Sequence, residues 1–328
     1  MQYGVSYFGN RIRRYVKQDM QYLAEQGFTY VLHTYSENDW SYYETTMKEI
    51  VEDAHSLGLK VHLDPWGMGG IFGGEAFSQL VSTHPEMNQV LNSGEMAPAV
   101  CLNNPLFREH MKAWIDSAAK LQADYILWDE PHWYIARWFG RPDQKNLWTC
   151  RCPHCQTLFF RQFGYEMPTE MNQDINQFRA DSVLSFLEDM TTYAHQVGIR
   201  NAVCLLPDEF NADLVMDWEK VVSLPNVDMF GTDPYWYLTK YSVEEFVSRY
   251  AERIRSLCLK YRKEEQLWIQ AFRVPENRES EIDIAFTIMR EHGINNISVW
   301  GFEACKHMSS LRPANPELVW KRILDNIR

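Results

Sequence analysis

The sequence lacks a long uninterrupted hydrophobic run. None of its 328 residues lie in an uncharged apolar stretch of about 18 residues, roughly the minimum for a membrane-spanning helix. The first residues, Met1–Tyr7, do not combine a basic region with an apolar run, so we expect them to begin a strand and not a secretory signal. The sequence therefore predicts a cytoplasmic protein with no membrane partner.

Basic residues are fewer than acidic ones, and the cysteines cannot all form disulfide pairs. The chain has 32 basic against 44 acidic residues and a net charge of −12, so a phosphate-binding surface and a nucleic-acid partner are not expected. Its seven cysteines are an odd number, which excludes a fully paired disulfide framework and favours reduced thiols. Aromatic residues, by contrast, make up 14% of the chain, enough for a large core or an aromatic-lined sugar cleft.

Short apolar runs alternate along the chain with longer amphipathic segments. We expect eight buried strands, at Tyr3–Phe8, Tyr30–Tyr35, Lys60–Pro65, Tyr125–Asp129, Ala202–Leu206, Met229–Asp233, Leu267–Phe272 and Asn296–Phe302. Helices are expected between them, at Val16–Glu25, Tyr43–Leu57, Asn104–Ala123, Asn176–Val197, Val243–Tyr261 and Glu279–His292. The alternation predicts one α/β domain over residues 1–328, a (β/α)8 TIM barrel.

Two connections are longer than the others and predict insertions. One follows the third strand, around Gly67–Pro98, and the other follows the fourth strand, at about residues 132–170. An open doubly wound sheet is the alternative fold, but it needs a glycine-rich phosphate turn after the first strand, which Phe8–Arg11 does not supply. The insertions could also contact a second subunit, so a homo-oligomer is one possible assembly.

Acidic and aromatic residues follow the expected strands. Active sites of TIM barrels lie at the carboxyl ends of the strands, where carboxylates among aromatic rings suit carbohydrate chemistry. Asp129 and Glu130 are the strongest candidates, and we expect Pro131 to hold Glu130 in an extended conformation. For Asp64 and Asp208 we expect helix capping instead.

A cysteine cluster lies in the second insertion. Cys150, Cys152 and Cys155 fall within six residues, a spacing typical of a tight metal knuckle. A tetrahedral zinc site needs one more ligand, which Cys101 or, as the alternative, His154 would supply. Four thiolates would close the coordination shell, so we expect a structural zinc that fixes this insertion.

The stretch from Cys101 to His110, the acidic pair and the cluster from Cys150 to Cys155 resemble glycoside hydrolase family 42, the zinc-containing β-galactosidases. The resemblance covers roughly residues 100–164 and implies four cysteine ligands for zinc, with Glu130 as the acid/base. The chain departs from this family in two places. It has Asp129 where the family has Asn, and the seventh strand carries Gln270 where the family has a nucleophilic Glu.

The motif Trp128-Asp-Glu-Pro131 is similar to glycoside hydrolase families 20 and 123, and is closest to the β-N-acetylgalactosaminidases of family 123. That similarity implies substrate-assisted catalysis, in which the 2-acetamido carbonyl of the sugar replaces the enzyme nucleophile. Glu130 would be the acid/base, and Asp129 would orient the acetamido N–H. The expected activity is a retaining exo-β-N-acetylhexosaminidase, and the expected partner is a carbohydrate substrate.

We expect further residues to contact the substrate: Trp66, His132, Asp233, Tyr235, Trp236, Gln270, Trp300 and Glu303. Two other functions stay open. One is a retaining β-galactosidase-like enzyme in which Glu303 or Asp233 is the nucleophile, and the other is a barrel that binds sugar without cleaving it. A pair of catalytic aspartates on strands four and six, Asp129 and Asp233, is a further alternative.

Overall fold

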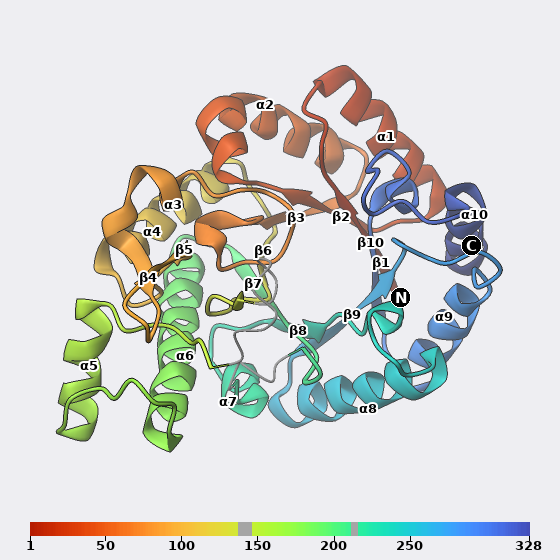
Figure 1. The fold of residues 1–328 in the computed structure, drawn as a ribbon. Helices are drawn as coiled ribbons and strands as arrows, with labels where there is room; N and C mark the ends of the chain where they lie inside the picture. The colour runs from red at the N-terminus through yellow and green to blue at the C-terminus, as the bar shows by residue number, and fades with distance from the viewer. Residues whose placement is uncertain (137–145, 211–215) are drawn as a thin grey trace.

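The computed structural model describes residues 1–136, 146–210 and 216–328. Eight parallel strands close into a barrel in the order β1-β10-β9-β8-β7-β6-β3-β2, and helices surround them (Figure 1). The predicted TIM barrel is thereby confirmed. The strands of the barrel are β1 (Gln2–Tyr7), β2 (Tyr30–Thr34), β3 (Lys60–Asp64), β6 (Tyr125–Asp129), β7 (Arg200–Leu205), β8 (Met229–Thr232), β9 (Glu264–Gln270) and β10 (Asn296–Trp300).

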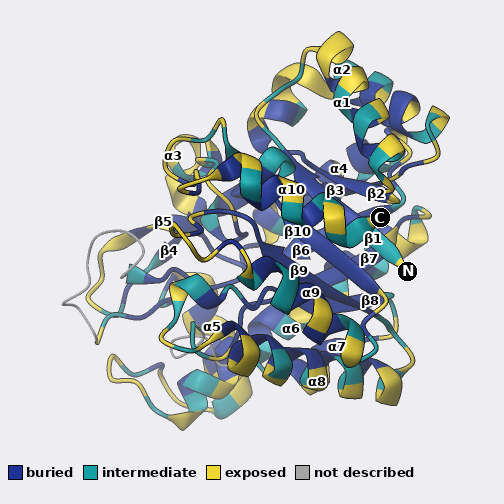
Figure 2. Ribbon diagram, turned by 90° about the vertical axis from the view of Figure 1, so that its right-hand side faces the viewer, coloured by how far each residue is buried: buried dark blue, intermediate teal, exposed yellow. Residues whose placement is uncertain are grey.

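Both faces of the barrel strands are buried, as Figure 2 shows. All five residues of β6 are buried, because one face packs into the barrel interior and the other packs under the helices. Tyr30, Gln266 and Ser298 join in a hydrogen-bonded network inside the barrel, so the polar atoms of these three side chains have partners there. The strand positions are therefore fixed by continuous apolar runs and by internal polar pairing.

The helices of the outer layer begin and end at residues suited to these positions. Ser36 caps α2 in a reciprocal capping box with Asp39, and Ser242 caps α8. Gly27 ends α1 in the left-handed conformation. The helices that surround the barrel are α1 (Arg13–Gln26), α2 (Glu37–Ser56), α4 (Pro105–Lys120), α6 (Gln173–Gln196), α7 (Trp218–Val222), α8 (Val243–Tyr261), α9 (Glu281–Glu291) and α10 (Pro316–Ile327).

The two long connections carry structure of their own. After β3 come the short helices η1 (Met68–Gly70), α3 (Leu80–Thr83) and η2 (Pro85–Met87), followed by the antiparallel pair β4 (Asn88–Val90) and β5 (Met96–Val100). After β6 comes α5 (Pro153–Phe163), which packs beside α6. Two further 3-10 turns, η4 (Trp236–Leu238) and η5 (Phe302–Cys305), follow β8 and β10. Within the described ranges, no helix is long and apolar enough to cross a membrane.

Candidate active site

A cavity of about 500 Å³ opens at the carboxyl ends of the barrel strands. Acidic residues from β6 and from the turn after β8 meet aromatic and aliphatic side chains there, as expected for the functional end of a TIM barrel. The lining consists of Gly74, Glu75, Asp129, Glu130, Leu206, Phe210, Asp233, Tyr235, Leu238, Phe272, Arg273, Trp300 and Leu311.

Asp129 and Glu130 both line this cavity although they are adjacent in the chain. Adjacent strand residues point to opposite faces, but β6 ends at Asp129 and the backbone then turns. Glu130 has a φ of +46°, so the predicted extended conformation is wrong. Its amide donates to the Cys204 carbonyl at 3.0 Å, which holds the turn against β7. The left-handed turn, and not an extended Glu130, therefore brings the second carboxylate into the cavity.

Gly73 holds the glycine-rich loop after β3 directly against the acidic pair. The Gly73 amide donates to the Asp129 carbonyl at 3.0 Å. A Cβ atom on Gly73 would lie 2.4 Å from Asp129 Oδ2 and 3.1 Å from Glu130 Oε2. Only a residue without a side chain fits, so both carboxyl groups lie on the side of β6 that faces this loop.

Asp233 completes a group of interacting carboxyl groups. Burial raises the pKa values of Asp129 and Glu130 well above their ordinary range, and neighbouring carboxylates raise them further. Burial also raises the pKa of Asp233 to about 7, although a hydrogen bond with Glu130 opposes that rise. A carboxyl–carboxylate hydrogen bond needs one shared proton. We therefore infer that Glu130 carries a proton and donates it towards Asp233 at neutral pH.

Asp64 lies beneath this group and does not cap a helix. Its carboxyl group is fully buried, neither oxygen has a hydrogen-bond partner, and its pKa is raised by burial and then by Asp129 and Glu130. The Asp208 carboxylate pairs with Arg253 at 2.5 Å. The residues that follow Phe210 lie partly outside the described ranges, so the capping role of Asp208 stays a prediction. Asp64 is therefore a buried carboxylic acid next to the site, a position that the sequence reasoning did not assign to it.

Two charged residues of the cavity were not predicted. Glu75 comes from the glycine-rich loop, and Arg273 follows β9 with a φ of +51°. The Arg273 amide donates to the Leu311 carbonyl at 2.7 Å, and its Nε donates to the Ser310 carbonyl at 3.0 Å, which fixes the side chain at the rim. Glu75 lies far from the end of any expected strand, so the strand-end rule could not find it. Arg273 directly follows the expected strand Leu267–Phe272, but the search of strand ends was for acidic and aromatic residues and passed over this basic one.

Five of the predicted substrate residues lie in or beside the cavity, and Asp233, described above, is one of them. Tyr235 and Trp300 line it, and the Tyr235 ring packs edge-on against Phe272 with centroids 5.0 Å apart. His132 lies on the far side of Glu130, where its Nδ1 is 2.6 Å from the Glu130 carbonyl oxygen and burial lowers its pKa to about 4. Trp66 stacks on Phe8 below the glycine-rich loop.

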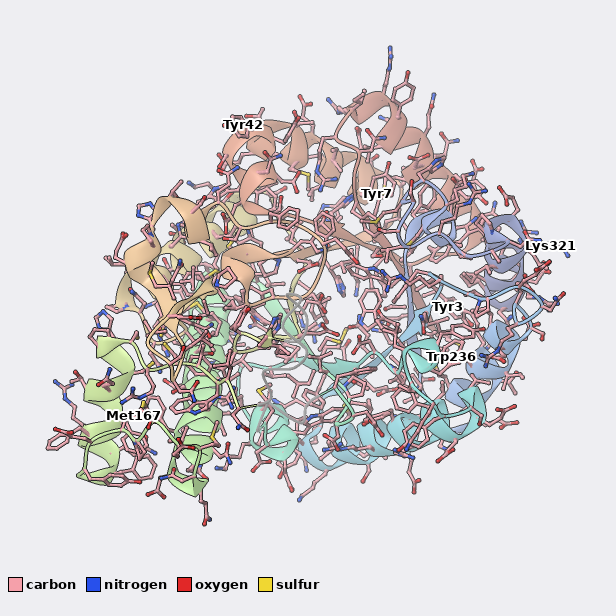
Figure 3. The ribbon with its side chains drawn as sticks, in the orientation of Figure 1. Tyr3, Tyr7, Tyr42, Met167, Trp236 and Lys321 are labelled. Carbon is pink, nitrogen blue, oxygen red and sulfur yellow. The ribbon has the colours of Figure 1, made fainter. Side chains whose placement is uncertain are left out.

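Three predicted substrate residues are not part of the cavity wall. Trp236, the first residue of η4, is buried, and its indole donates to Glu281 Oε2 at 2.8 Å (Figure 3). Gln270 is fully buried, accepts from the Tyr237 amide and donates to the Phe272 carbonyl, so it supports the wall without lining it. Glu303 pairs with Lys306 at 2.6 Å and with His307 at 3.3 Å. The cavity therefore receives no carboxylate from the end of β9 or from η5.

The four candidate zinc cysteines meet in one buried cluster. Their sulfur atoms all lie within 4.8 Å of one another: Cys101, Cys150, Cys152 and Cys155. The Cys101 sulfur is 3.5 Å from that of Cys155 and 3.6 Å from that of Cys152. Sulfurs at the corners of a zinc tetrahedron with bonds of about 2.3 Å are separated by about 3.8 Å. The cluster is therefore a suitable metal site.

Amide groups around the cluster point at its sulfur atoms. The Val90 amide donates to Cys150 Sγ at 3.5 Å, and the Asn103 side-chain amide donates to Cys155 Sγ at 3.4 Å. Such donors stabilise thiolates and orient metal ligands. Because Val90 belongs to β4 and Asn103 precedes α4, the cluster joins both insertions to the barrel.

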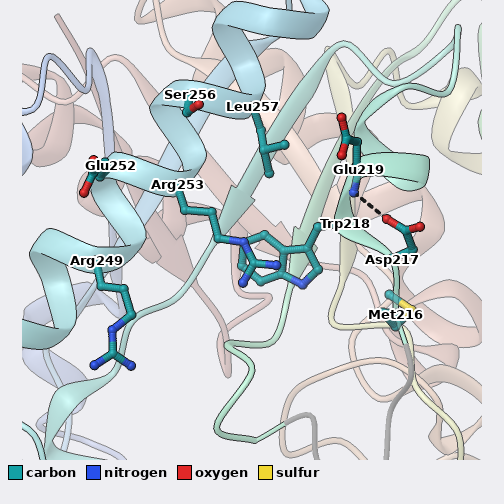
Figure 4. A pocket seen from close by; sticks show the side chains of 9 residues that line it. All are labelled: Met216, Asp217, Trp218, Glu219, Arg249, Glu252, Arg253, Ser256 and Leu257. Atoms are coloured by element: carbon teal, nitrogen blue, oxygen red, sulfur yellow. Dashed lines mark hydrogen bonds between the residues drawn. The ribbon is translucent and has the colours of Figure 1, made fainter.

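Another hollow, of about 530 Å³, lies on the outer surface beside α7 and α8 (Figure 4). Arg253 covers the Trp218 ring there, with its guanidinium 3.9 Å from the ring centroid. The arginines of this hollow are already paired with acids, Arg253 with Asp208 and Arg249 with Glu245. It therefore presents neither a free aromatic face nor converging free charges, unlike the cavity at the strand ends.

No family model matches the chain, and no curated protein matches its sequence. Solved structures match its fold. The catalytic domain of a β-amylase from Paenibacillus polymyxa has a TM-score of 0.67 at 11% identity, over 100% of this chain and 98% of that one. A family 42 β-galactosidase has a TM-score of 0.74 at 13% identity, over 99% of this chain and 56% of that one.

An endo-β-1,4-mannanase from Thermotoga petrophila matches with a TM-score of 0.59 at 10% identity, over 100% of this chain and 76% of that one. This chain thus spans little more than half of the β-galactosidase. At these identities the matches establish a shared fold. Fold and site together define a TIM-barrel protein with an acidic, aromatic-lined cavity at the carboxyl ends of its strands.

Proposed function

We propose that this protein is a glycoside hydrolase, a retaining exo-β-N-acetylhexosaminidase that uses the 2-acetamido group of its substrate as the nucleophile. The observation that carries the proposal is the adjacent pair Asp129 and Glu130, both of which line one cavity at the end of β6. The likeness of the Trp128–Pro131 motif to family 123 favours galactosamine-type sugars. Trp300 and Tyr235 supply the apolar and aromatic surface on which a sugar ring packs.

In the first step, Glu130 acts as the general acid. Its raised pKa keeps it protonated near neutral pH, and it transfers that proton to the glycosidic oxygen as the bond to the anomeric carbon breaks. The acetamido carbonyl oxygen of the same sugar attacks the anomeric carbon and forms an oxazolinium ion. Asp129 accepts a hydrogen bond from the acetamido N–H and stabilises the positive charge, and Tyr235 donates to the carbonyl oxygen.

In the second step, Glu130 acts as the general base. Its carboxylate takes a proton from a water molecule, whose oxygen attacks the anomeric carbon from the face that the aglycone has left. The carbon–oxygen bond of the oxazolinium ring breaks, and its electron pair returns to the acetamido carbonyl. The sugar therefore leaves with its original anomeric configuration, and Glu130 regains its proton for the next cycle.

The contents of the cavity support this mechanism over one with an enzyme nucleophile at the seventh barrel strand. Gln270 occupies the end of β9 and its side chain is bonded to the Phe272 carbonyl, while Glu303 is neutralised by Lys306. Retaining enzymes with two carboxylates hold them about 5–5.5 Å apart, one on each side of the bond. Neither Gln270 nor Glu303 offers a second carboxylate in that position.

The hydrogen bond between Glu130 and Asp233 favours one alternative. In a β-galactosidase-like enzyme, Asp233 would be the nucleophile and Glu130 the acid/base. The two groups would have to separate when the substrate enters, because hydrogen-bonded carboxyls lie closer than that mechanism needs. We give Asp233 a binding role instead, in which its carboxylate accepts hydrogen bonds from sugar hydroxyls.

For the cysteine cluster we propose a structural zinc ion bound by Cys101, Cys150, Cys152 and Cys155. A closed set of four thiolates leaves no position for a water molecule, so the metal would contribute to folding and not to the reaction. His154 has no part in the cluster of sulfur ligands.

Two reagents separate the proposed mechanism from the alternative. A thiazoline analogue of the oxazoline should inhibit competitively and bind much more tightly than the substrate. A 2-fluoro glycoside with a good leaving group should leave the intact protein mass unchanged. A mass increase of one sugar, mapped to Asp233 or to any other carboxylate, would contradict substrate assistance and establish a glycosyl-enzyme.

A further inference from the structure

A second cavity, also of about 500 Å³, lies on the other side of Glu130. It shares three residues with the first cavity, Gly74, Glu75 and Glu130, and the rest of its lining differs. Glu130 therefore lies on the boundary between two cavities. Under the proposed function this position is informative, because a general acid protonates the oxygen that joins the two halves of the substrate.

The wall of the second cavity is mainly apolar. The apolar residues of the wall are Phe72, Ala76, Phe77, Val81 and Pro98. Of these, Phe77 is 96% exposed to solvent. A fully exposed phenylalanine at the rim of a cavity suits a partner with an apolar face.

Apart from the carboxyl groups of Glu75 and Glu130, which both cavities share, the described residues of this wall include two polar side chains, Ser78 and His132, and both already contact the protein. The Ser78 hydroxyl donates to Glu37 Oε1 at 2.6 Å, and His132 Nδ1 contacts the Glu130 carbonyl. A sugar unit needs several hydrogen-bonding groups for recognition, whereas an apolar alcohol needs only one proton donor at its oxygen. Because the wall offers many apolar contacts and few hydrogen-bonding groups, it favours an apolar aglycone over a second sugar.

Glu37 holds this wall in place. Its buried carboxylate accepts from the Gly69 amide at 3.0 Å, from the Gln79 amide at 2.6 Å and from the Leu80 amide at 2.9 Å. The loop backbone is also closely packed, since a Cβ on Gly67 would lie 2.2 Å from the Ala76 carbonyl oxygen. The second cavity is therefore a preformed feature, as a binding site requires.

We propose that this second cavity binds the leaving group of the substrate and selects an aglycone with an aromatic or alkyl face that packs on Phe77. The proposal rests on the proposed glycosidase function and adds the class of substrate to it. The sugar would occupy the first cavity between Asp129, Asp233 and Trp300, and the aglycone would extend past Glu130 towards Phe77.

The test compares two β-N-acetylgalactosaminides, one with a 2-naphthyl aglycone and one with a small trifluoroethyl aglycone. Phe77→Ala should lower kcat/KM about ten-fold on the naphthyl substrate, near the upper end for loss of one aromatic pair, and leave the trifluoroethyl substrate unchanged. Phe77→Trp should retain the naphthyl preference. Tyr42→Ala is the matched control, because Tyr42 is a 74% exposed aromatic residue on the outer face of α2 (Figure 3).

A second measurement separates failure of this inference from failure of the proposed function. Binding of free 2-naphthol, followed by saturation-transfer NMR, should be seen for the wild type and Tyr42→Ala and be lost in Phe77→Ala. Turnover that Phe77→Ala lowers equally on both substrates, or on neither, would overturn the aglycone site while the glycosidase stands. Absence of all turnover with Phe77-dependent naphthol binding would overturn the glycosidase and retain an apolar ligand site.

Discussion

Gly73→Ala tests whether the carboxyl groups of the site must lie where the structure places them. A methyl group at residue 73 would be 2.4 Å from Asp129 Oδ2, whereas ordinary contacts begin at 3.4 Å, so the carboxyl group must move by about 1 Å. A displacement of that size in a catalytic group costs about 100-fold in rate. We expect kcat/KM for an aryl N-acetyl-β-galactosaminide to fall by about that factor, which corresponds to about 2.7 kcal/mol of transition-state stabilisation.

A double-mutant cycle identifies the cause of the loss. In an Asp129→Ala background the clashing carboxyl group is absent, so adding Gly73→Ala should cost far less than it does in the wild type. The melting temperature of each variant reports whether the barrel is intact. Full activity in Gly73→Ala, or an equal loss in both backgrounds with an unchanged melting temperature, would refute the assigned geometry of the acidic pair.

Three further predictions concern the metal, the carboxyl pKa values and the acid. Cys152→Ser should lose bound zinc and melt at a lower temperature, whereas Cys305→Ser, which lies outside the cluster, should keep its zinc. Metal analysis that finds zinc retained in Cys152→Ser would contradict the assigned zinc site. Burial raises the pKa of Asp233 to about 7, so between about pH 4 and pH 7 the folded protein holds a proton that the unfolded chain has lost, and stability falls as pH rises. Asp233→Asn should therefore melt at a higher temperature than the wild type at pH 8 and at a similar temperature at pH 4, and a lower melting temperature at pH 8 would be evidence against this pKa. Glu130→Gln should lower kcat by about 100-fold to 10,000-fold on alkyl glycosides and much less on nitrophenyl ones, because good leaving groups need little protonation; equal losses on both would remove Glu130 as the acid.

The barrel could be predicted from the sequence because its strands are continuous apolar runs, which the helical segments separate at a regular spacing. The structure departs from that pattern where local signals are weak. The pair β4 and β5 was not predicted, because β4 has only three residues and begins with Asn88 and Gln89. The helix α7 was missed because it has only five residues, and α5 and α10 were missed because long connections separate them from the strands that precede them.

The site could be predicted in part. The strand-end rule found Asp129, Glu130 and Asp233, which the structure brings into one cavity. It could not find Glu75, which a loop of the first insertion brings into the cavity. It placed Trp236 in the site because it is adjacent to Tyr235, but η4 turns its indole towards Glu281. The position of a residue in the sequence thus predicted which turns lie at the site, but it did not predict which side chains of those turns point into the cavity.

The most direct test of substrate assistance is one ratio of rates. Purified protein is assayed with the 4-nitrophenyl β-glycosides of N-acetylgalactosamine and galactose, which differ at the sugar only in the group on carbon 2. If the acetamido group is the nucleophile, kcat/KM should be higher for the N-acetyl sugar by about 10,000-fold or more, since its loss removes both the nucleophile and the partner of Asp129. Comparable rates on the two substrates would contradict the account and leave Glu130 with an enzyme nucleophile.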